Sequence, residues 1–259
     1  MPWWRQKLRN ICWKGFNRLE NNGDSDFSRN GEKAFIDTLI DVFVKEPNKE
    51  RVIFDIGANV GEYSQMLTQR IHSKGISCSL HLFEPTKACF AELQNRFAGT
   101  AAIRLNAFGL SDQEEKRQIF YDKEKSGLAS LYKRNLQHYN IEMEAAEEIV
   151  LETAVNYIEK AGIGHIDFVK IDIEGHELNA FKGFGKYLNA QFIDFVQFEY
   201  GGANLDSHTS LLELFRFFEA RGFILAKIMP KGLEIRNYSP MMENFVYANY
   251  VAVSGLLKR

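Results

Sequence analysis

The 259-residue sequence has few cysteines, no excess of one charge and no long apolar run. Its three cysteines, Cys12, Cys78 and Cys89, lack the short spacings of a metal site, and their odd number would leave one unpaired in a disulfide framework. The plain interpretation is a reduced, cytoplasmic compartment. No apolar segment approaches the length of a transmembrane helix, and the sequence shows no signal-peptide core.

The balanced charge also argues against one class of binding partner. A net charge of −2 and a pI near 6.3 argue against a nucleic-acid-binding surface, because phosphate binding requires concentrated positive charge. With 45% hydrophobic residues, the chain can bury one substantial α/β core and carry appendages. We therefore expect no nucleic-acid partner.

Residues 51–62 read RVIFDIGANVGE, a short apolar run followed by a glycine-rich turn. The helical spacing of the next apolar residues predicts a helix that ends near Gly75. Strand, tight loop and helix in this order are typical of the first unit of an open α/β sheet, which binds ligands at the carboxyl ends of its strands. We expect Gly57 to turn the chain and admit a ligand to the bare backbone, and Gly61 to let the helix start close to the strand.

The spacing within this loop favours one cofactor class. A dinucleotide loop needs three glycines around a pyrophosphate, whereas Asp55, Gly57, Asn59 and Gly61 provide only two. A carboxylate before the turn would repel a pyrophosphate and attract an ammonium group. The loop therefore favours the amino-acid tail of S-adenosylmethionine over a nicotinamide dinucleotide, and an ordinary strand-to-helix turn is the alternative.

The next two predicted strands also end in polar side chains. Residues 77–83 lead into Glu84, at the distance from the glycine loop where a carboxylate can bind both hydroxyls of a ribose. Residues 101–105 lead into Asn106, which we expect to lie at the edge of the adenine. Together with the glycine loop, these residues predict a nucleoside site along one edge of the sheet.

A second group of ionisable residues follows the predicted strands 166–173 and 192–199. Lys170, Asp172 and Glu174 would share one strand face, although a central parallel strand should be apolar on both faces. We predict that the two strands are neighbours and that their polar side chains converge as a general base or a divalent metal site. This predicted catalytic group is Asp172, Glu174, His176 and Glu199. A structural salt-bridge network around Lys170 is the alternative.

Two segments lie outside the regular α/β pattern. We divide the chain into an N-terminal amphipathic helix and linker, residues 1–30, and a main domain, residues 31–259. Residues 1–20 combine basic and apolar side chains at helical spacing. Packing on the domain or on a twin subunit is the interpretation we favour, and contact with an anionic membrane surface is the alternative. Residues 113–150 predict an insertion that either contacts substrate or is a solvated excursion.

Four segments together resemble the FkbM family of S-adenosylmethionine-dependent methyltransferases. They are D-I-G-A-N-V-G-E-Y-S at residues 55–64, L-F-E-P at 82–85, N-A-F-G-L-S-D at 106–112 and F-V-K-I-D-I-E-G-H-E-L at 168–178. The resemblance implies a class I, Rossmann-like fold, with a seven-stranded, mostly parallel sheet, helices on both faces and an antiparallel last strand. It implies methyl transfer, usually to a hydroxyl of a sugar or secondary metabolite.

The same resemblance assigns expected roles to individual residues. The glycine loop would hold the methionine part of the cofactor, Glu84 the ribose and Asn106 the adenine, while Asp172 would border both cofactor and acceptor. A catalytically inactive cofactor-binding scaffold is the alternative function. The missing glycine pattern weakens a nicotinamide dehydrogenase, and Asp172-Ile173-Glu174-Gly175 differs from the Asn/Asp-Pro-Pro-aromatic element of base-modifying nucleic-acid methyltransferases.

Overall fold

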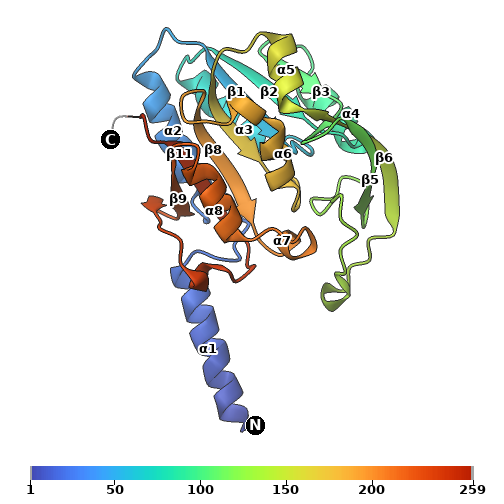
Figure 1. The fold of residues 1–259 in the computed structure, drawn as a ribbon, viewed down its shortest axis with the longest axis vertical. Helices are drawn as coiled ribbons and strands as arrows, with labels where there is room; N and C mark the ends of the chain where they lie inside the picture. The colour runs from blue at the N-terminus through green and yellow to red at the C-terminus, as the bar shows by residue number, and fades with distance from the viewer. Residues whose placement is uncertain (1, 258–259) are drawn as a thin grey trace.

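Eight strands form the central sheet of the computed structural model, which describes residues 2–257 (Figure 1). Across the sheet, the order is β10 (Gly232–Ile235), β9 (Phe223–Met229), β11 (Ala248–Ser254), β8 (Ile193–Tyr200), β7 (Ile166–Ile171), β1 (Arg51–Ile56), β2 (Cys78–Phe83) and β3 (Ile103–Asn106). The last strand, β11, is antiparallel to β8 and β9, and β10 is antiparallel to β9. The other strands share one direction, so their carboxyl ends meet at one edge of the sheet.

This architecture confirms the predicted α/β class and the antiparallel last strand, and it adds an eighth strand. The tight hairpin joins β9 to β10, with Gly232 paired to Met229. The chain then returns as β11 between β8 and β9, where it bonds to both.

Helices cover both faces of the sheet and enclose two apolar clusters. One face carries α2 (Glu32–Val44), α3 (Glu62–Ser73) and α4 (Lys87–Arg96). The other carries α5 (Ala154–Ala161), α6 (Glu177–Gly183) and α8 (Leu211–Glu219), while the short helix α7 (Ala203–Asp206) follows β8. Because each helix buries one apolar face, the sheet is shielded from water except at its ends.

Local capping explains where several helices begin. Thr153 accepts a hydrogen bond from the backbone of Asn156 at the start of α5. Ser210 caps α8, because its hydroxyl accepts a hydrogen bond from the backbone of Glu213. The short helix α7 lies between β8 and Ser207, which follows its last residue.

The predicted insertion contains a small second sheet. Its strands are β4 (Gly109–Ser111), β6 (Ala145–Thr153) and β5 (Glu115–Tyr121), in that spatial order. A separate cluster of Ile119, Leu131, Ile149 and Leu151 holds this sheet together. In Figure 1 it stands beside the main sheet, connected through β3 and α5. It is therefore an ordered subdomain and not a solvated excursion.

The N-terminal helix, α1 (Trp3–Leu19), projects away from the domain (Figure 1). None of its residues is buried, so the prediction that it packs on the domain is wrong. Packing on a twin subunit stays a prediction. No helix within residues 2–257 is long and apolar enough to cross a membrane.

Candidate active site

The turn after β1 is tied to the loop after β7. Gly57 has a φ of +81°, and a Cβ added there would lie 2.0 Å from the backbone oxygen of Asp172. The glycine is thus required by the approach of another backbone segment, where we expected the approach of a ligand. Gly61, also at φ +81°, caps α3, and a Cβ there would meet the side chains of Leu93 and Phe97 in α4. Its close neighbour is therefore a helix and not β1.

Glu84 connects the glycine loop to the end of β2. Its Oε2 accepts a hydrogen bond from the backbone of Asn59 at 2.9 Å, and its Oε1 accepts two from Thr86, at 2.9 Å from the backbone and 2.6 Å from the hydroxyl. Asn59 adopts a positive φ of 47°, which aims its amide at this carboxylate. A carboxylate offers about four lone-pair positions, so Glu84 can accept one further hydrogen bond.

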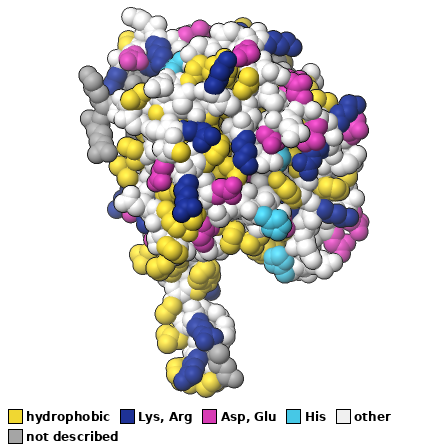
Figure 2. All heavy atoms as spheres, viewed as in Figure 1, with side chains coloured by type: hydrophobic (Ala, Val, Ile, Leu, Met, Phe, Trp, Pro, Cys, Tyr) yellow, Lys and Arg dark blue, Asp and Glu magenta, His cyan; other side chains and the backbone are white. Residues whose placement is uncertain are grey.

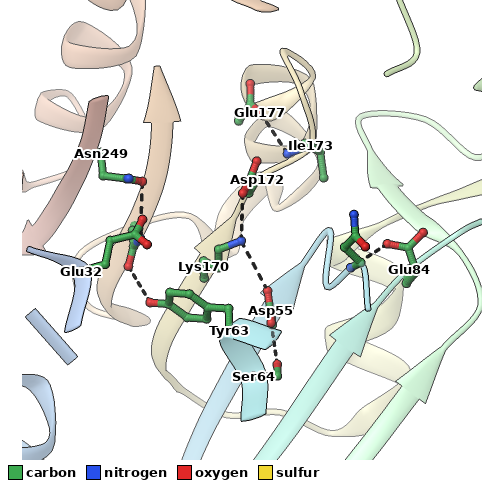
Figure 3. Close-up of polar contacts among 12 residues, drawn as sticks. Glu32, Asp55, Tyr63, Ser64, Glu84, Lys170, Asp172, Ile173, Glu177 and Asn249 are labelled. Atoms are coloured by element: carbon green, nitrogen blue, oxygen red, sulfur yellow. Dashed lines mark hydrogen bonds and ion pairs between the residues drawn. The ribbon is translucent and has the colours of Figure 1, made fainter. Parts of the chain in front are cut away.

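Asp55, Lys170 and Asp172 form a chain beneath the carboxyl ends of β1 and β7 (Figure 3). The Lys170 ammonium lies 3.2 Å from Asp172 and 3.9 Å from Asp55. Asp55 also accepts a hydrogen bond from the Ser64 hydroxyl at 2.5 Å, but its Oδ1 has no hydrogen-bond partner. The predicted salt-bridge network around Lys170 therefore exists, and it includes two of the predicted site residues.

Burial and charge act against each other in this chain. Burial raises the pKa of Asp55, and the nearby Lys170 only partly offsets that rise. Burial alone would lower the pKa of Lys170, but Asp172, Asp55 and Glu32 raise it above its ordinary value. Lys170 is therefore a fixed positive charge between carboxylates.

Asp172, Glu174 and Glu199 come together at the ends of the neighbouring strands β7 and β8. Burial and then Asp172 raise the pKa of Glu174 to about 8, while burial, Asp172 and Glu174 raise the pKa of Glu199. Glu174 has a φ of 51°, so the strand alternation that we extended to this residue ends before it. Arg134 binds its Oε2 at 2.5 Å.

His176 is close in sequence to this group but is held apart from it. Its Nε2 lies 2.9 Å from the Ser111 hydroxyl, and its Nδ1 lies 3.1 Å from the Tyr132 hydroxyl. Burial, followed by the charge of Arg117, lowers the pKa of the imidazole to about 4. The four predicted catalytic residues therefore separate into three converging carboxylates and a neutral imidazole that supports the insertion.

A second buried polar network lies beside Lys170 (Figure 3). The Gln197 amide donates to Glu32 at 3.1 Å, and the Tyr63 hydroxyl donates to the oxygen of Gln197 at 2.6 Å. Glu32 keeps one oxygen without a hydrogen bond, and burial raises its pKa to about 7. Glu177, with Oε2 unpaired, likewise has its pKa raised to about 7 by burial.

Some of the predicted site residues border a cleft between the main sheet and the insertion, whereas Glu32, Gln197 and Glu177 do not. The cleft contains about 630 Å³ of space free of protein atoms, part of it open to solvent. Predicted residues in its wall are Gly57, Asn59, Glu84, Asp172, Glu174 and His176. Within residues 2–257, Asp55, Gly61, Asn106 and Glu199 do not line it. Asn106 instead donates to the backbone oxygen of Leu82 at 3.0 Å.

Residues 55–225 match the family model of the methyltransferase FkbM domain. The chain belongs to the FkbM family of methyltransferases. None of the functionally curated proteins matches it. The chain is similar in structure to an FkbM methyltransferase from Methylobacillus flagellatus KT, with 17% identity and a TM-score of 0.47, over 80% of this chain and 45% of that one.

Two further solved structures are similar at lower identity. The N-terminal domain of human METTL16 is 10% identical, with a TM-score of 0.46, over 93% of this chain and 78% of that one. TrmK of M. capricolum, solved with S-adenosyl-homocysteine, is 11% identical, with a TM-score of 0.40, over 85% of this chain and 71% of that one. The chain thus spans less than half the length of the FkbM structure and most of the other two.

The cleft of this FkbM domain has the chemistry that S-adenosylmethionine requires. Glu84 keeps hydrogen-bonding capacity for a ribose hydroxyl, and Leu110, Ile119 and Ile149 supply apolar walls for a base. Asp172 lies at the end of β7 with its side chain 37% exposed, so it can accept a hydrogen bond from an ammonium group. Asp55, which we expected to face the ammonium, is 1% exposed and acts on the cleft only through Lys170.

The FkbM domain does not gather the predicted catalytic group into a metal-ligand cluster. Among the described residues, the set with ligand atoms within 4.8 Å of one another is His165, Asp167 and Asp194, at the amino end of β7 and β8. Asp167 is already bound by Lys49 and Arg51. This set therefore lies far from the cleft and is held by protein cations.

Several residues of the cleft carry no local sequence signal. Arg134 and Tyr132 reach Glu174 and His176 from the insertion, and the Ser126 backbone accepts a hydrogen bond from the Asn59 amide at 3.0 Å. Glu32 looks like an ordinary acid at a helix start. Their roles depend on contacts between segments distant in the sequence, which residue spacing does not reveal.

Proposed function

We propose that the protein is an S-adenosylmethionine-dependent O-methyltransferase whose acceptor is a hydroxyl of a sugar, glycan or secondary metabolite. Membership in the FkbM family supports methyl transfer. The observation that carries the proposal is the cleft that places Glu84 on one wall and Asp172 with Glu174 on another. Glu84 can thus bind a nucleoside, while a carboxylate on the other wall accepts the proton of the acceptor hydroxyl.

The methyl donor and the methyl acceptor require different contacts with the protein. When bound, S-adenosylmethionine supplies a methyl group on a sulfonium, which is a good leaving group. Glu84 and the backbone around Asn59 bind and orient the nucleoside, and residues of the insertion form part of the cleft wall. Lys170 holds the Asp172 carboxylate in place, and this carboxylate accepts a hydrogen bond from the ammonium group of the cofactor.

Glu174 is the proposed proton acceptor. An alcohol is a weak acid, so its oxygen becomes a competent nucleophile only as a base removes the proton. Glu174 lines the cleft and has a pKa raised to about 8, which makes it a stronger base than an ordinary carboxylate. Arg134 holds Oε2, so Oε1 is the oxygen that receives the proton. His176 is less suited because both ring nitrogens already have hydrogen-bond partners.

Calorimetric titration with S-adenosylmethionine tests the cofactor assignment. The parent protein is expected to bind, and Glu84→Ala is expected to weaken binding by about tenfold or more, since a charge-assisted hydrogen bond is lost. The exposed Glu219→Ala serves as the control and should bind like the parent. Absence of binding to the folded parent would refute the assignment.

Glu174→Gln separates catalysis from binding. This variant is expected to bind S-adenosylmethionine normally and to lower methyl transfer by about a hundredfold or more, because general-base catalysis typically contributes that much. Unchanged cellular function in Glu174→Gln, with cofactor binding intact, would favour the inactive scaffold instead.

A further inference from the structure

The helix α1 (Trp3–Leu19) exposes an unusual concentration of large apolar side chains. Trp3, Leu8 and Ile11 are 75%, 54% and 58% exposed, and Leu19 is 79% exposed. The space-filling view shows apolar and basic side chains side by side on the projecting helix (Figure 2). All three tryptophans of the chain, Trp3, Trp4 and Trp13, belong to this helix. Apolar groups left in water at this density require a covering surface.

The base of α1 is fixed to the domain, although no residue of the helix itself is buried. Glu20 binds Lys227 at 3.4 Å and Arg236 at 3.3 Å, and the Asn21 amide donates to the backbone oxygen of Ile228 at 2.9 Å. The backbone of Gly23 donates to Tyr247 at 2.7 Å. The direction in which α1 leaves the domain is therefore set by the fold, and its exposed side chains are presented outward.

The side chains of α1 are sorted by helical spacing. Trp4, Leu8, Ile11 and Leu19 follow one apolar stripe, since they recur at three- and four-residue intervals or their multiples. Basic residues follow the two borders of that stripe, Lys7, Lys14 and Arg18 on one side and Arg5 and Arg9 on the other. The helix contains no acidic residue, whereas the whole chain has a net charge of −2.

We infer that α1 docks on an anionic lipid surface. An apolar stripe bordered by Lys and Arg lets the apolar side chains enter the interface while the basic groups reach the lipid phosphates. Tryptophan is suited to the boundary between lipid headgroups and acyl chains, because one end of its ring is apolar and the other donates a hydrogen bond. The basic residues and the apolar stripe of α1 are thus both complementary to an anionic lipid surface.

Other occupants match only part of this pattern. A second copy of α1 would cover the stripe but would bring two sets of five basic residues together, with no acidic residue on either helix. A nucleic acid would neutralise the basic residues but would leave the apolar stripe uncovered. An anionic membrane satisfies both features.

The anchor also determines which end of the domain approaches the lipid. Tyr247, which binds Gly23, immediately precedes β11, and Ala248 at the start of β11 pairs with Tyr200 at the carboxyl end of β8. The base of α1 therefore lies at the carboxyl-end edge of the sheet, the edge that carries the cleft. Docking through α1 would bring that edge close to the membrane surface.

Intrinsic tryptophan fluorescence provides a direct test, because every tryptophan reports on α1. The full chain is titrated with vesicles of phosphatidylcholine alone and of phosphatidylcholine mixed with phosphatidylserine. We expect a blue shift and co-sedimentation with the mixed vesicles only, weakened by salt. Equal binding to both vesicle types, or no shift with either, would overturn the inference.

Two paired substitutions test the two halves of the pattern. Lys7→Gln with Lys14→Gln should weaken binding to the mixed vesicles by about thirtyfold, given the usual contribution of two basic residues near anionic lipid. Leu8→Gln with Ile11→Gln should abolish the blue shift. These side chains are exposed, so the fold should be retained.

A matched pair, Lys116→Gln with Lys186→Gln, removes the same charge from exposed sites elsewhere. It should bind like the parent, and an equal loss in this pair would overturn the inference. Two further results would also overturn it: tighter binding to single-stranded RNA than to the mixed vesicles in the same salt, or a stable dimer that dissociates in Leu8→Gln with Ile11→Gln. None of these measurements depends on methyl transfer.

Discussion

Asp167 and Asp55 are both 1% exposed and lie on neighbouring strands, but their surroundings differ. Asp167, at the amino end of β7, accepts hydrogen bonds from Arg51 and from the backbone of Val52, each at 2.9 Å, and Lys49 lies 2.8 Å away. Asp55, near the carboxyl end of β1, has one oxygen without a hydrogen bond and its nearest ammonium at 3.9 Å.

The two ends of the sheet thus differ in how completely their buried carboxylates are hydrogen-bonded. At the amino end, a carboxylate is fully paired and supports the fold. At the carboxyl end, Asp55, Glu32 and Glu177 each keep an unpaired oxygen, although a buried polar atom without a partner costs stability. The carboxyl end is also the end that carries the cleft, although Asp55, Glu32 and Glu177 do not line it.

The largest effect on stability is expected from Asp167→Asn. This change removes the buried anionic partner of the Arg51 guanidinium, which is 3% exposed, and leaves it only the exposed Glu46 carboxylate at 3.3 Å. Breaking a buried ion pair costs about 3–5 kcal/mol. Urea denaturation measures the loss. The control is Glu148→Gln, which breaks the exposed pair with Lys116 and should cost less than about 1 kcal/mol. Similar losses in both variants would contradict the structural role of Asp167.

A smaller, pH-dependent effect is expected from Glu32→Gln. The folded-state pKa of Glu32 is about 7, above its ordinary value of 4.5, so the folded state favours the protonated carboxyl. Its stabilising contribution is full below pH 4.5 and is lost as the pH rises through 7, by about 3 kcal/mol at most.

Denaturation at several pH values between about 3.5 and 8, a range of about one unit either side of that window, should therefore show a flatter profile in Glu32→Gln than in the parent. Glu177, whose pKa is also about 7, should preserve part of the slope. The exposed Glu219→Gln should follow the parent profile. A Glu32→Gln profile as steep as the parent's would show that Glu32 is not buried as a neutral acid.

The smallest effect on stability is expected from Asp55→Asn, at about 1 kcal/mol. The amide oxygen can still accept the Ser64 hydrogen bond, and Lys170 keeps Asp172 at 3.2 Å. Burial also raises the pKa of Asp55, so its charge contributes little to folding. The same urea denaturation decides the matter, since a loss as large as in Asp167→Asn would remove the contrast between the two ends of the sheet.

Local sequence patterns were sufficient to predict the core of the fold. The apolar run before Asp55, the glycines after it and the helical spacing from Tyr63 place β1 and α3 correctly, since each depends on residues close in sequence. β7 and β8 are parallel neighbours paired up to Ile171 and Phe198, so Asp172 and Glu199 each follow the last paired position of their strand.

The remaining site geometry depends on contacts that spacing does not specify. Strand alternation suggested that Glu174 continues β7, but its left-handed backbone turns the side chain to Arg134. We included His176 in the predicted catalytic group because it belongs to the same motif, but the hydroxyls of Ser111 and Tyr132 hydrogen-bond to its ring. These partners come from the segment between β3 and α5, whose path over the cleft is set by tertiary packing.

The additional strand β10 bears on self-association. Without it, β9 would end the sheet with a long row of unpaired backbone groups, a template for another chain. The four residues of β10 pair with β9 and leave an outer edge that is short and carries Glu234. Short, charged edges resist strand pairing between molecules. The β9–β10 hairpin thus protects this end of the sheet from edge-to-edge aggregation.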